Sequence, residues 1–384
     1  MFVGITNTPR DYAWGSTTAI ANLLGTTPSG SPQAELWLGA HPGSPSVVLE
    51  PENVGGAANL SELVGPEGLP FLLKVLAASH PLSLQAHPTL DQAAEGFARE
   101  NALGIPLDAA NRNYKDALHK PELIYALTNG FRALCGFRDA SETRATIDRL
   151  LGALPGDAAL TGWLARLQMD DDIRATFEWL VSGGSDVSEL VEAVIEAAAL
   201  LDGPNFDLVA QLATEYPGDP GIVISLMLNL VSLEKGEVLY LPAGNIHAYV
   251  EGLGIELMAS SDNVLRGGLT PKHVDVPELL SVLDFSPVEV PYLAPEEPVA
   301  GVQIFRPDVA DFVLTVVDAD GAVTIDAAGP AIAICTAGDV ELDGYTLEHG
   351  TSVFVTADDR ITTVAGHGTV FIATTGTATT GTAA

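Results

Sequence analysis

The segment LSLQAHP at residues 82–88 carries side chains whose types and spacing suit a metal site. Gln85 and His87 are two residues apart, and on a β-strand such a pair points to the same face of the sheet. An amide oxygen and an imidazole nitrogen are both ordinary metal ligands. Taken alone, the pair also fits a polar strand face or a hydrogen-bonded histidine in the core, so both interpretations stay open here.

A second segment, NYKDALHKPELIYALT at 113–128, crowds His119, Lys120 and Glu122 into four residues. Because Pro121 disfavours the helical conformation for the residue before it, we expect Lys120 to be extended and to share a face with Glu122. A solvated charged loop is the alternative. Against it, the apolar run after Glu122 predicts a strand, in which an unpaired carboxylate would be costly.

The third segment, GEVLYLPAGNIHAYVEG at 236–252, has an apolar strand, a Pro-Ala-Gly turn and then a histidine. This order resembles the second half of a cupin motif, in which a hairpin presents a metal-binding histidine inside a β-barrel. His247 and Tyr249 share a face by the same two-residue spacing.

The fourth segment, at 255–283, contains Arg266 after the polar turn SSDN. Gly267 and Gly268 follow it and permit close approach of a ligand to the backbone. A guanidinium suits a phosphate group, although a plain surface arginine is the alternative. The chain has no GxxxxGKS/T or GxGxxG phosphate loop and no GxSxG nucleophile motif.

The elements that must position these side chains follow from the apolar patterning. Residues 1–100 show short apolar runs broken by Gly and Pro, which favours an all-β unit. Between about 89 and 215, apolar residues at helical spacing behind Asp, Ser and Thr predict amphipathic helices. After YPGDPG at 216–221 strands return, and we expect two β-hairpins in 221–270 and a short helix at 271–283. Alternation from about 288 predicts a second small sandwich or barrel.

The charge is lopsided, with 50 Asp and Glu against 17 Lys and Arg among 384 residues and a net charge of −33. Such a body should repel nucleic-acid phosphates and anionic lipids, so we expect neither as a partner. Because 47% of the residues are apolar, large cores can form despite the charge. Four of the five lysines, and Arg266, lie inside the motif segments, which predicts a local positive site in an acidic protein; these lysines are Lys74, Lys115, Lys120 and Lys272.

Cys135 and Cys335 lie 200 residues apart in apolar runs, which predicts two buried, reduced thiols. The N-terminal residues have no charged stretch followed by an apolar one, so no signal peptide is indicated. No apolar run approaches the ~18 residues that a membrane-spanning helix needs. We therefore expect a cytoplasmic protein.

Seven segments in order around the helical part resemble those of type I mannose-6-phosphate isomerases (phosphomannose isomerases) of the cupin superfamily. They are DYAWGS, AELWLGAHP, LPFLLKVL, PLSLQAHP, NYKDALHKPE, LYLPAGNIHAY and SSDNVLRGGLTPKHVD, and they span about residues 5–285. Two departures are visible: Ile246 stands where the family usually has Pro, and Ala117-Leu118 stand where it commonly has Pro-Asn. Neither replaces a ligand.

The resemblance implies a mainly β fold with an α-helical insertion. We expect a cupin (jelly-roll) catalytic domain at 1–100 and 216–287, to which 113–130 contributes the metal-ligand strand. A helical insertion at 131–215, a C-terminal jelly-roll-like β domain at 288–373 and a disordered tail at 374–384 complete the prediction.

The resemblance also implies one zinc ion per chain, held by Gln85, His87, Glu122 and His247. The implied reaction interconverts mannose 6-phosphate and fructose 6-phosphate through an enediolate. We expect Arg266 to clamp the phosphate or to stabilise the enediolate. Lys120 and His119 rank ahead of Glu256 as the proton-transfer base. The remaining substrate contacts are assigned to Ser83, Lys74, Tyr249, Trp14 and Glu35.

Two other functions stay open at this point. One is another metal-cupin enzyme, such as a different sugar-phosphate isomerase, and the other is a non-catalytic sugar-binding or regulatory cupin. The expected partner is a small sugar phosphate, and the expected state is a monomer. A role in GDP-mannose biosynthesis and one in mannose catabolism are both compatible with the sequence.

Overall fold

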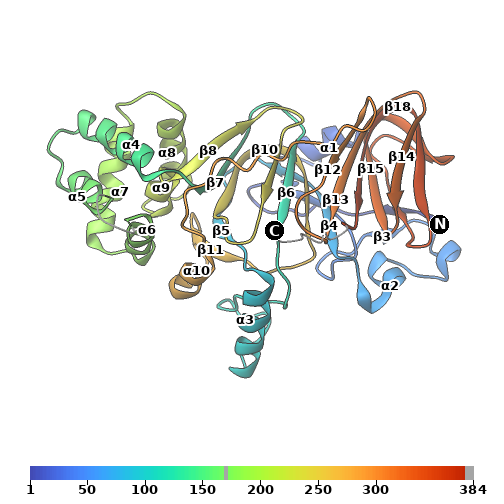
Figure 1. Cartoon of the computed structure of the whole chain (residues 1–384), viewed down its shortest axis with the longest axis horizontal. Coiled ribbons are helices and arrows are strands. Elements are labelled where there is room, and N and C mark those ends of the chain that lie inside the picture. The colour runs from blue at the N-terminus through green and yellow to red at the C-terminus, as the bar shows by residue number, and fades with distance from the viewer. Residues whose placement is uncertain (168–171, 377–384) are drawn as a thin grey trace, which may run out of the picture.

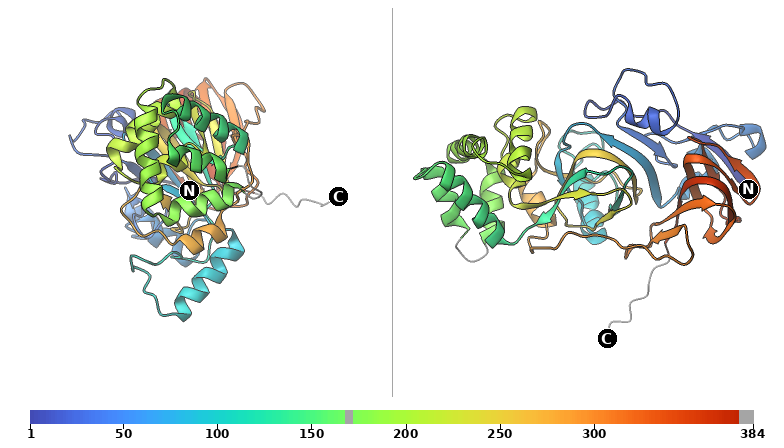
Figure 2. Two further views of the ribbon diagram at one scale, coloured as in Figure 1. Left: turned by 90° about the vertical axis from the view of Figure 1, so that its left-hand side faces the viewer. Right: turned by 90° about the horizontal axis from the view of Figure 1, so that it is seen from above.

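The structure is a computed structural model that describes residues 1–167 and 172–376. Three parts follow one another along the longest axis (Figure 1). A group of helices lies at one end, a curved sheet that we call the central sheet lies in the middle, and a second sheet, the C-terminal sheet, lies at the other end. The view from above separates the same three parts (Figure 2).

The central sheet has nine strands within the described residues, and all its pairings are antiparallel. They are β2 (Glu35–Leu38), β4 (Phe71–Ala78), β5 (Leu84–Ala86), β6 (Glu122–Ala126), β7 (Phe131–Phe137), β8 (Leu228–Leu233), β9 (Val238–Leu241), β10 (His247–Ala259) and β11 (Leu265–Gly268). The long strand β10 joins the others, because its first half pairs with β5 and β7 and its second half pairs with β4 and β6.

The C-terminal sheet also has nine strands within the described ranges, again antiparallel. They are β1 (Phe2–Thr6), β3 (Val47–Val48), β12 (Val302–Phe305), β13 (Val313–Asp320), β14 (Val323–Ala328), β15 (Ala331–Leu342), β16 (Tyr345–Leu347), β17 (Ser352–Val355) and β18 (Arg360–Thr374). Strand β1 pairs with β17, and β3 pairs with β1. The first strand of the chain therefore completes the C-terminal sheet, where we expected all of 1–100 in the catalytic unit.

Strand alternation gives the central sheet two different faces. Leu73 of β4 and Leu257 of β10 pack in one apolar cluster with Phe371 of the C-terminal sheet. Their neighbours Lys74 and Glu256, one residue along each strand, point to the opposite face and are register partners. The charged residues of the candidate site on these two strands therefore lie on the face turned away from the C-terminal sheet.

The helical part comprises α4 (Ala140–Ala153), α5 (Ala158–Arg166), α6 (Asp172–Ser182), α7 (Ser185–Ala198), α8 (Pro204–Glu215) and α9 (Gly221–Ser225). Asp139 and Asp157 cap α4 and α5 by accepting backbone N–H groups. Trp163 and Phe177 are fully buried in one core that also includes Phe137 of β7. The other helices are α1 (Ala19–Leu23), α2 (Leu60–Val64), α3 (Leu90–Ala102), α10 (Val276–Val282) and the 3₁₀ turns η1 (Pro51–Val54) and η2 (Gly65–Glu67).

Three predicted boundaries differ from the structure. The range 131–215 begins with strand β7, so the helices start only at Ala140. FRALCGF is a short, continuous apolar run, and pairing on both sides with β8 and β10 makes it a strand. Residues 221–225 form a helix where we expected a strand, because Pro220 and the Asp219 side chain start a helical turn there.

The third difference concerns the expected break between the two hairpins at 252–254, because β10 runs through it without a turn from His247 to Ala259. Gly252, with φ +139, and Gly254 bend and pack this strand and do not form a turn. A Cβ on Gly252 would clash with the Phe131 ring, and one on Gly254 would lie 2.9 Å from the Tyr125 carbonyl oxygen. Close packing across the sheet thus explains both glycines.

Strand β18 continues to Thr374, the first residue of the expected tail, and residues 377–384 lie outside the described residues. Cys135 and Cys335 are buried free thiols, as predicted. In the described ranges no helix combines the length and the apolar character that crossing a bilayer requires.

Candidate metal centre and active site

Four polar side chains from three separate chain segments meet on the charged face of the central sheet. Gln85 lies on β5 opposite His247, the first residue of β10. Glu122, the first residue of β6, lies opposite Met258 near the other end of β10. Ligand atoms of His87, Glu122 and His247 all lie within 4.8 Å of one another. Gln85 joins them, with its amide Nε2 3.2 Å from His247 Nε2.

The two imidazoles of this cluster are oriented as in a metal site. His87 Nδ1 lies 2.8 Å from the Asn263 carbonyl oxygen, and His247 Nδ1 lies 3.1 Å from that of Asn245. When Nδ1 donates to a carbonyl, the proton is on that nitrogen and Nε2 offers its lone pair. Both Nε2 atoms face the Glu122 carboxylate at 3.2 Å.

Whether a metal ion fits this cluster can be judged from the buried polar atoms that lack a hydrogen-bond partner. Within the described residues, His87 Nε2 and Glu122 Oε2 are buried and have no hydrogen-bond partner. A buried polar atom left unpaired is costly, so the pair indicates a missing partner. Two imidazoles, one carboxylate and one amide form an N/O set that suits zinc and leaves room for a further ligand. The residues present therefore fit the ion.

The surroundings of the cluster favour the protonation states in which His87 and Glu122 can bind a metal ion. Burial, followed by the nearby Lys120 ammonium, lowers the pKa of His87 to about 4, so its imidazole is neutral at neutral pH. Burial by itself opposes ionisation of Glu122, but Lys120 and the imidazoles outweigh it and lower the pKa of that carboxyl well below its usual range. A neutral imidazole and a carboxylate are the forms that bind a metal.

Lys120 and His119 separate onto opposite sides of the chain. Lys120 Nζ lies 2.8 Å from Glu122 Oε1, and its side chain is only 9% exposed. His119 Nε2 instead lies 2.9 Å from Asp311 Oδ2, in the loop before β13. The extended backbone before Pro121 makes successive side chains alternate. Of these two candidates for the base, the structure brings only Lys120 to the cluster, and the third candidate, Glu256, contacts Lys74 nearby.

A second charged group lies beside the ligands. Lys74 Nζ is 2.8 Å from Glu256 Oε2 and 3.6 Å from Glu35 Oε1, and all three side chains are nearly buried. Burial lowers the pKa of Lys74, but Glu256 and Glu35 outweigh it and raise the pKa above its ordinary value. The Trp37 indole N–H donates to Glu35 Oε2 at 2.8 Å. This arrangement keeps Lys74 charged.

A cavity of about 620 Å³ opens beside these groups, a size typical of small-ligand sites. Gln85 and Glu35 line it, as do four cations: Lys74, Lys115, Lys120 and Arg266. Within the described residues, the Arg266 side chain makes neither a hydrogen bond nor an ion pair. Burial lowers the pKa of this half-buried guanidinium. A partly desolvated guanidinium in a cavity is suited to an anion.

A smaller cavity of about 290 Å³ adjoins the first, and Gln85 and Arg266 line both. Trp14, Ser83 and Lys272 belong to its wall. Tyr249 is buried behind the ligands, with its ring centroid 6.2 Å from that of His247. Burial and the nearby Glu256 raise its pKa well above the ordinary value.

Known proteins resemble this chain in sequence over most of its length. The family model for the catalytic domain of type I phosphomannose isomerase matches residues 2–140. Mannose-6-phosphate isomerase of Escherichia coli is 39% identical, with 94% of this chain and 96% of that protein covered. The human mannose-6-phosphate isomerase is 33% identical, with 82% and 81% covered. The chain belongs to the type I phosphomannose isomerase family.

Solved structures of phosphomannose isomerases share the whole fold. The Salmonella typhimurium enzyme bound to substrate and zinc has a TM-score of 0.86 at 34% identity, covering 98% of this chain and all of that one. A mannose-6-phosphate isomerase bound with zinc and yttrium gives the same TM-score of 0.86. The family and the mainly β, cupin-like fold expected from the sequence are thus confirmed. The individual roles of the site residues remain predictions.

Several residues of the larger cavity were not singled out from the sequence. They are Tyr12, Trp37, Leu107, Asp108 and Asp262. Tyr12 and Trp37 stand inside the DYAWGS and AELWLGAHP motifs, and Asp262 stands inside SSDN, so the motifs were a usable signal. Leu107 and Asp108 carry no signal, because they come from the loop after α3.

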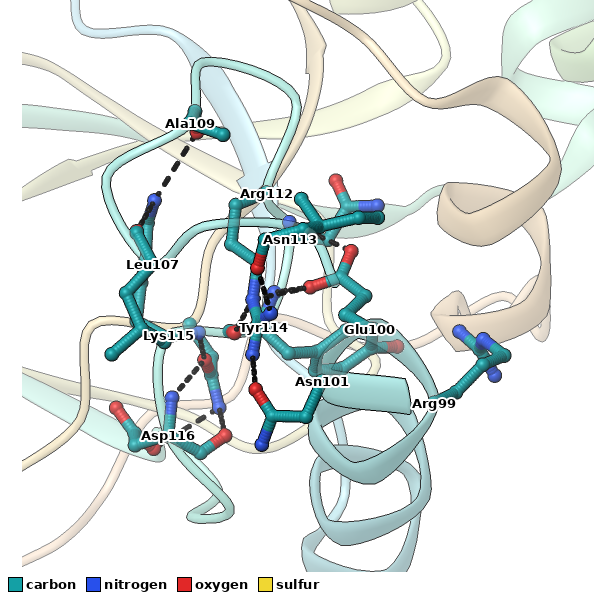
Figure 3. A network of polar contacts seen from close by, with 12 residues as sticks. Arg99, Glu100, Asn101, Leu107, Ala109, Arg112, Asn113, Tyr114, Lys115 and Asp116 are labelled. Atoms are coloured by element: carbon teal, nitrogen blue, oxygen red, sulfur yellow. Dashed lines mark hydrogen bonds and ion pairs between the residues drawn. The ribbon is translucent and has the colours of Figure 1, made fainter. Parts of the chain in front are cut away.

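That loop is fastened to α3 by a buried polar network (Figure 3). Arg112 Nε lies 2.8 Å from Glu100 Oε2, and another of its nitrogens donates to Asn101 Oδ1 at 2.7 Å. Lys115 Nζ donates to the Leu107 carbonyl oxygen at 2.6 Å. These bonds fold the loop back on itself and hold Leu107 and Lys115 at the cavity wall.

Proposed function

We propose that this chain is a zinc-dependent mannose-6-phosphate isomerase, which interconverts D-mannose 6-phosphate and D-fructose 6-phosphate. The observation that carries the proposal is the buried His87, Glu122 and His247 cluster next to a cavity lined by several cations. The relatives at 33–39% identity bear the name of this enzyme, an aldose–ketose isomerase.

Gln85, His87, Glu122 and His247 would hold the zinc ion. Bound there, zinc would supply a Lewis acid that stabilises negative charge on the oxygens at C1 and C2. The protein's own part is to keep both Nε2 atoms aimed at one point, through the bonds of the two Nδ1 atoms to backbone carbonyl oxygens. His87 remains neutral because burial lowers its pKa.

The phosphate would occupy the smaller cavity, and the sugar would lie in the larger one. Arg266 lines both cavities, and Ser83 and Lys272 line the smaller one. A guanidinium, an ammonium and a hydroxyl are together a complete donor set for a phosphate dianion. Trp14 adds an aromatic wall to the same cavity.

Proton transfer between C2 and C1 is assigned to Lys120, with Glu256 as the second candidate. Both side chains have an ion-pair partner at 2.8 Å, Glu122 for Lys120 and Lys74 for Glu256, but Lys120 lines the larger cavity beside the ligand cluster and Glu256 is not among the residues that line it. A base must come within hydrogen-bond reach of the proton it removes, which the position of Lys120 permits.

The other predicted site residues would have different roles. His119 drops out as the base because its imidazole contacts Asp311. Lys74 and Glu35, which both line the larger cavity, would order the sugar hydroxyls. Tyr249 would support the ligands from behind, next to the His247 ring.

The same proposal covers the surroundings of the enzyme. We expect a cytoplasmic monomer whose partner is the small sugar phosphate, without nucleic-acid or membrane partners. The net charge of −33 supports the exclusion of polyanions.

A coupled assay with mannose 6-phosphate and zinc tests the proposal against its two alternatives. Formation of fructose 6-phosphate would support it. Turnover of another hexose phosphate alone would favour a different metal-cupin isomerase. Binding of mannose 6-phosphate without any product would favour the non-catalytic sugar-binding protein, and both of these results would overturn the proposal.

A further inference from the structure

The segment 216–221, which connects α8 to α9 within the helical part, contacts both walls of the smaller cavity. It follows α8 directly and carries the turn-rich sequence YPGDPG. Tyr216 itself lines this cavity together with Ser83 and Lys272. Nothing in the proposed chemistry uses this segment, yet its side chains make specific bonds to the residues that surround the cavity.

The Asp219 carboxylate holds the backbone of the 268–270 turn. Oδ1 accepts the Leu269 N–H at 2.9 Å, and Oδ2 accepts that of Thr270 at 3.2 Å. Oδ1 also accepts the Gly221 N–H at 2.7 Å. Hydrogen bonds to a charged acceptor are stronger than neutral ones, so this carboxylate fixes the turn firmly.

The turn needs such support because its backbone is strained. Leu269 has φ +54, a conformation that a side chain other than glycine rarely adopts. A Cβ on Gly268 would meet Asp219 Oδ1 at 3.2 Å, and one on Gly221 would meet the Leu269 side chain at 2.7 Å. The two segments are therefore packed backbone against backbone, with the carboxylate between them.

The turn also leads to the cations of the cavity. Arg266 precedes it on β11, and Lys272 follows it, with its backbone N–H donating to Thr270 Oγ1 at 3.1 Å. On the opposite wall, the Tyr216 hydroxyl donates to the Pro81 carbonyl oxygen at 2.6 Å, two residues before Ser83. One short segment thus makes hydrogen bonds both to the chain that leads to Ser83 and to the turn that leads to Lys272.

We propose that the segment 216–221 positions the two walls of the phosphate cavity, with Asp219 as its principal positioning residue acting through Lys272. This inference rests on the proposed function, since it takes the smaller cavity as the phosphate site. The phosphate does not react, so its contacts are equally strong in the ground state and the transition state. Their loss raises KM and leaves kcat nearly unchanged.

The test is a double-mutant cycle on the zinc-loaded, full-length protein with Asp219→Asn and Lys272→Ala. The Asn side chain keeps the size of Asp but presents an NH₂ group to one or two of the three backbone N–H groups that the carboxylate accepts. We expect each single variant to raise KM for mannose 6-phosphate about tenfold, with kcat within about threefold of the parent. The double variant should resemble the single ones and should not reach the ~100-fold of two independent effects. The inhibition constant of inorganic phosphate should rise in parallel with KM.

Asp157→Asn is the matched control, because Asp157 accepts the Leu160 N–H at the start of α5, away from the cavity. It should leave KM and the phosphate inhibition constant unchanged. Should Asp219→Asn fail to fold, Tyr216→Phe removes one hydroxyl only and should raise KM about threefold at constant kcat.

The outcomes separate this inference from the proposed function. No turnover by the parent protein would overturn the proposed function and this inference with it. Normal turnover by the parent, a raised KM for Lys272→Ala and an unchanged KM for Asp219→Asn would overturn the inference alone. Fully additive effects, or a fall in kcat equal to the rise in KM, would also contradict it.

Discussion

The central sheet and the C-terminal sheet have the same number of described strands and the same antiparallel pairing, yet among the described residues of the two sheets only the central one carries buried charged side chains. The free face of the central sheet carries Lys74, Glu122 and Glu256. The corresponding cluster of the C-terminal sheet is apolar, with Val353, Ile372 and other fully buried side chains. The same architecture thus surrounds a candidate active site in one case and forms a packed support in the other.

The difference shows how side-chain alternation along a strand decides which face of a sheet can carry charged, reactive groups. On β4 and β10 one set of alternate side chains faces the C-terminal sheet and is apolar, while the other set carries Lys74 and Glu256 among apolar residues such as Leu76. Each of these charged groups is buried beside a group of opposite charge, because an unpaired charge in the protein interior would be very costly. In the C-terminal sheet both sets of side chains are buried along much of β15 and along the end of β18, so charged groups have no place on those stretches.

Substitution of the carboxylate at the ligand cluster should have the largest effect. Glu122→Gln keeps the size of the side chain but removes the charge that faces both imidazoles. We expect the zinc content to fall and kcat/KM to drop about 10⁴-fold. Metal analysis and the coupled assay measure both quantities.

A buried polar group of the other sheet supplies the matched control. Ser352 Oγ donates to the Ile5 carbonyl oxygen at 2.9 Å, and Ser352→Ala should cost about 1 kcal/mol of stability with turnover unchanged. If both variants lost activity equally, the contrast between the two sheets would not hold.

Removal of the cavity guanidinium should have the second largest effect. Arg266→Ala leaves both cavities without their shared cation. We expect kcat/KM to fall about 10³-fold, equivalent to ~4 kcal/mol, with the zinc content unchanged. Steady-state kinetics measure the loss. A loss below about tenfold (~1.4 kcal/mol) would remove Arg266 from the site.

Truncation of a core side chain in the C-terminal sheet should affect stability alone. Ile372 is fully buried among apolar neighbours, so Ile372→Ala should cost about 4 kcal/mol of unfolding free energy. Urea unfolding followed by tryptophan fluorescence and circular dichroism measures this. The folded variant should keep its kcat/KM, and a specific loss of turnover would show that the C-terminal sheet takes part in the chemistry.

Acid should destabilise the central sheet of the metal-free protein. The pKa of His87 is about 4 in the folded state and 6.5 in the unfolded chain. The unfolded chain therefore binds more protons between these values, and the unfolding free energy should fall by up to about 3 kcal/mol as the pH drops from 6.5 to 4. His87→Gln should lack most of this dependence in urea titrations at several pH values. An unchanged slope in the variant would contradict the assignment.

The sequence was sufficient for the family, the fold class and the residues of the ligand cluster. Gln85 with His87, and Lys120 with Glu122, followed from two-residue spacing on extended backbone, and the structure does bring these side chains together. The separation of His119 from Lys120 follows from the same rule, but the Asp311 that receives His119 is 192 residues away and has no local signal.

The features that could not be predicted from the sequence depend on packing between residues far apart in the chain. Gly252 and Gly254 have the appearance of a turn, and only the proximity of Phe131 and Tyr125 explains why β10 continues through them. The pairing of β1 with β17 joins the two ends of the chain, which no short-range pattern indicates. The bonds from Asp219 to the 268–270 turn span about 50 residues and were invisible for the same reason.

Removal and return of zinc tests the central claim most directly. The purified protein is treated with a chelator until metal analysis finds no zinc, assayed with mannose 6-phosphate, and assayed again after Zn²⁺ is added. The cluster of His87, Glu122 and His247, with Gln85 beside it, predicts loss of isomerase activity and its recovery at one zinc ion per chain. Unchanged turnover in the metal-free protein would contradict the account.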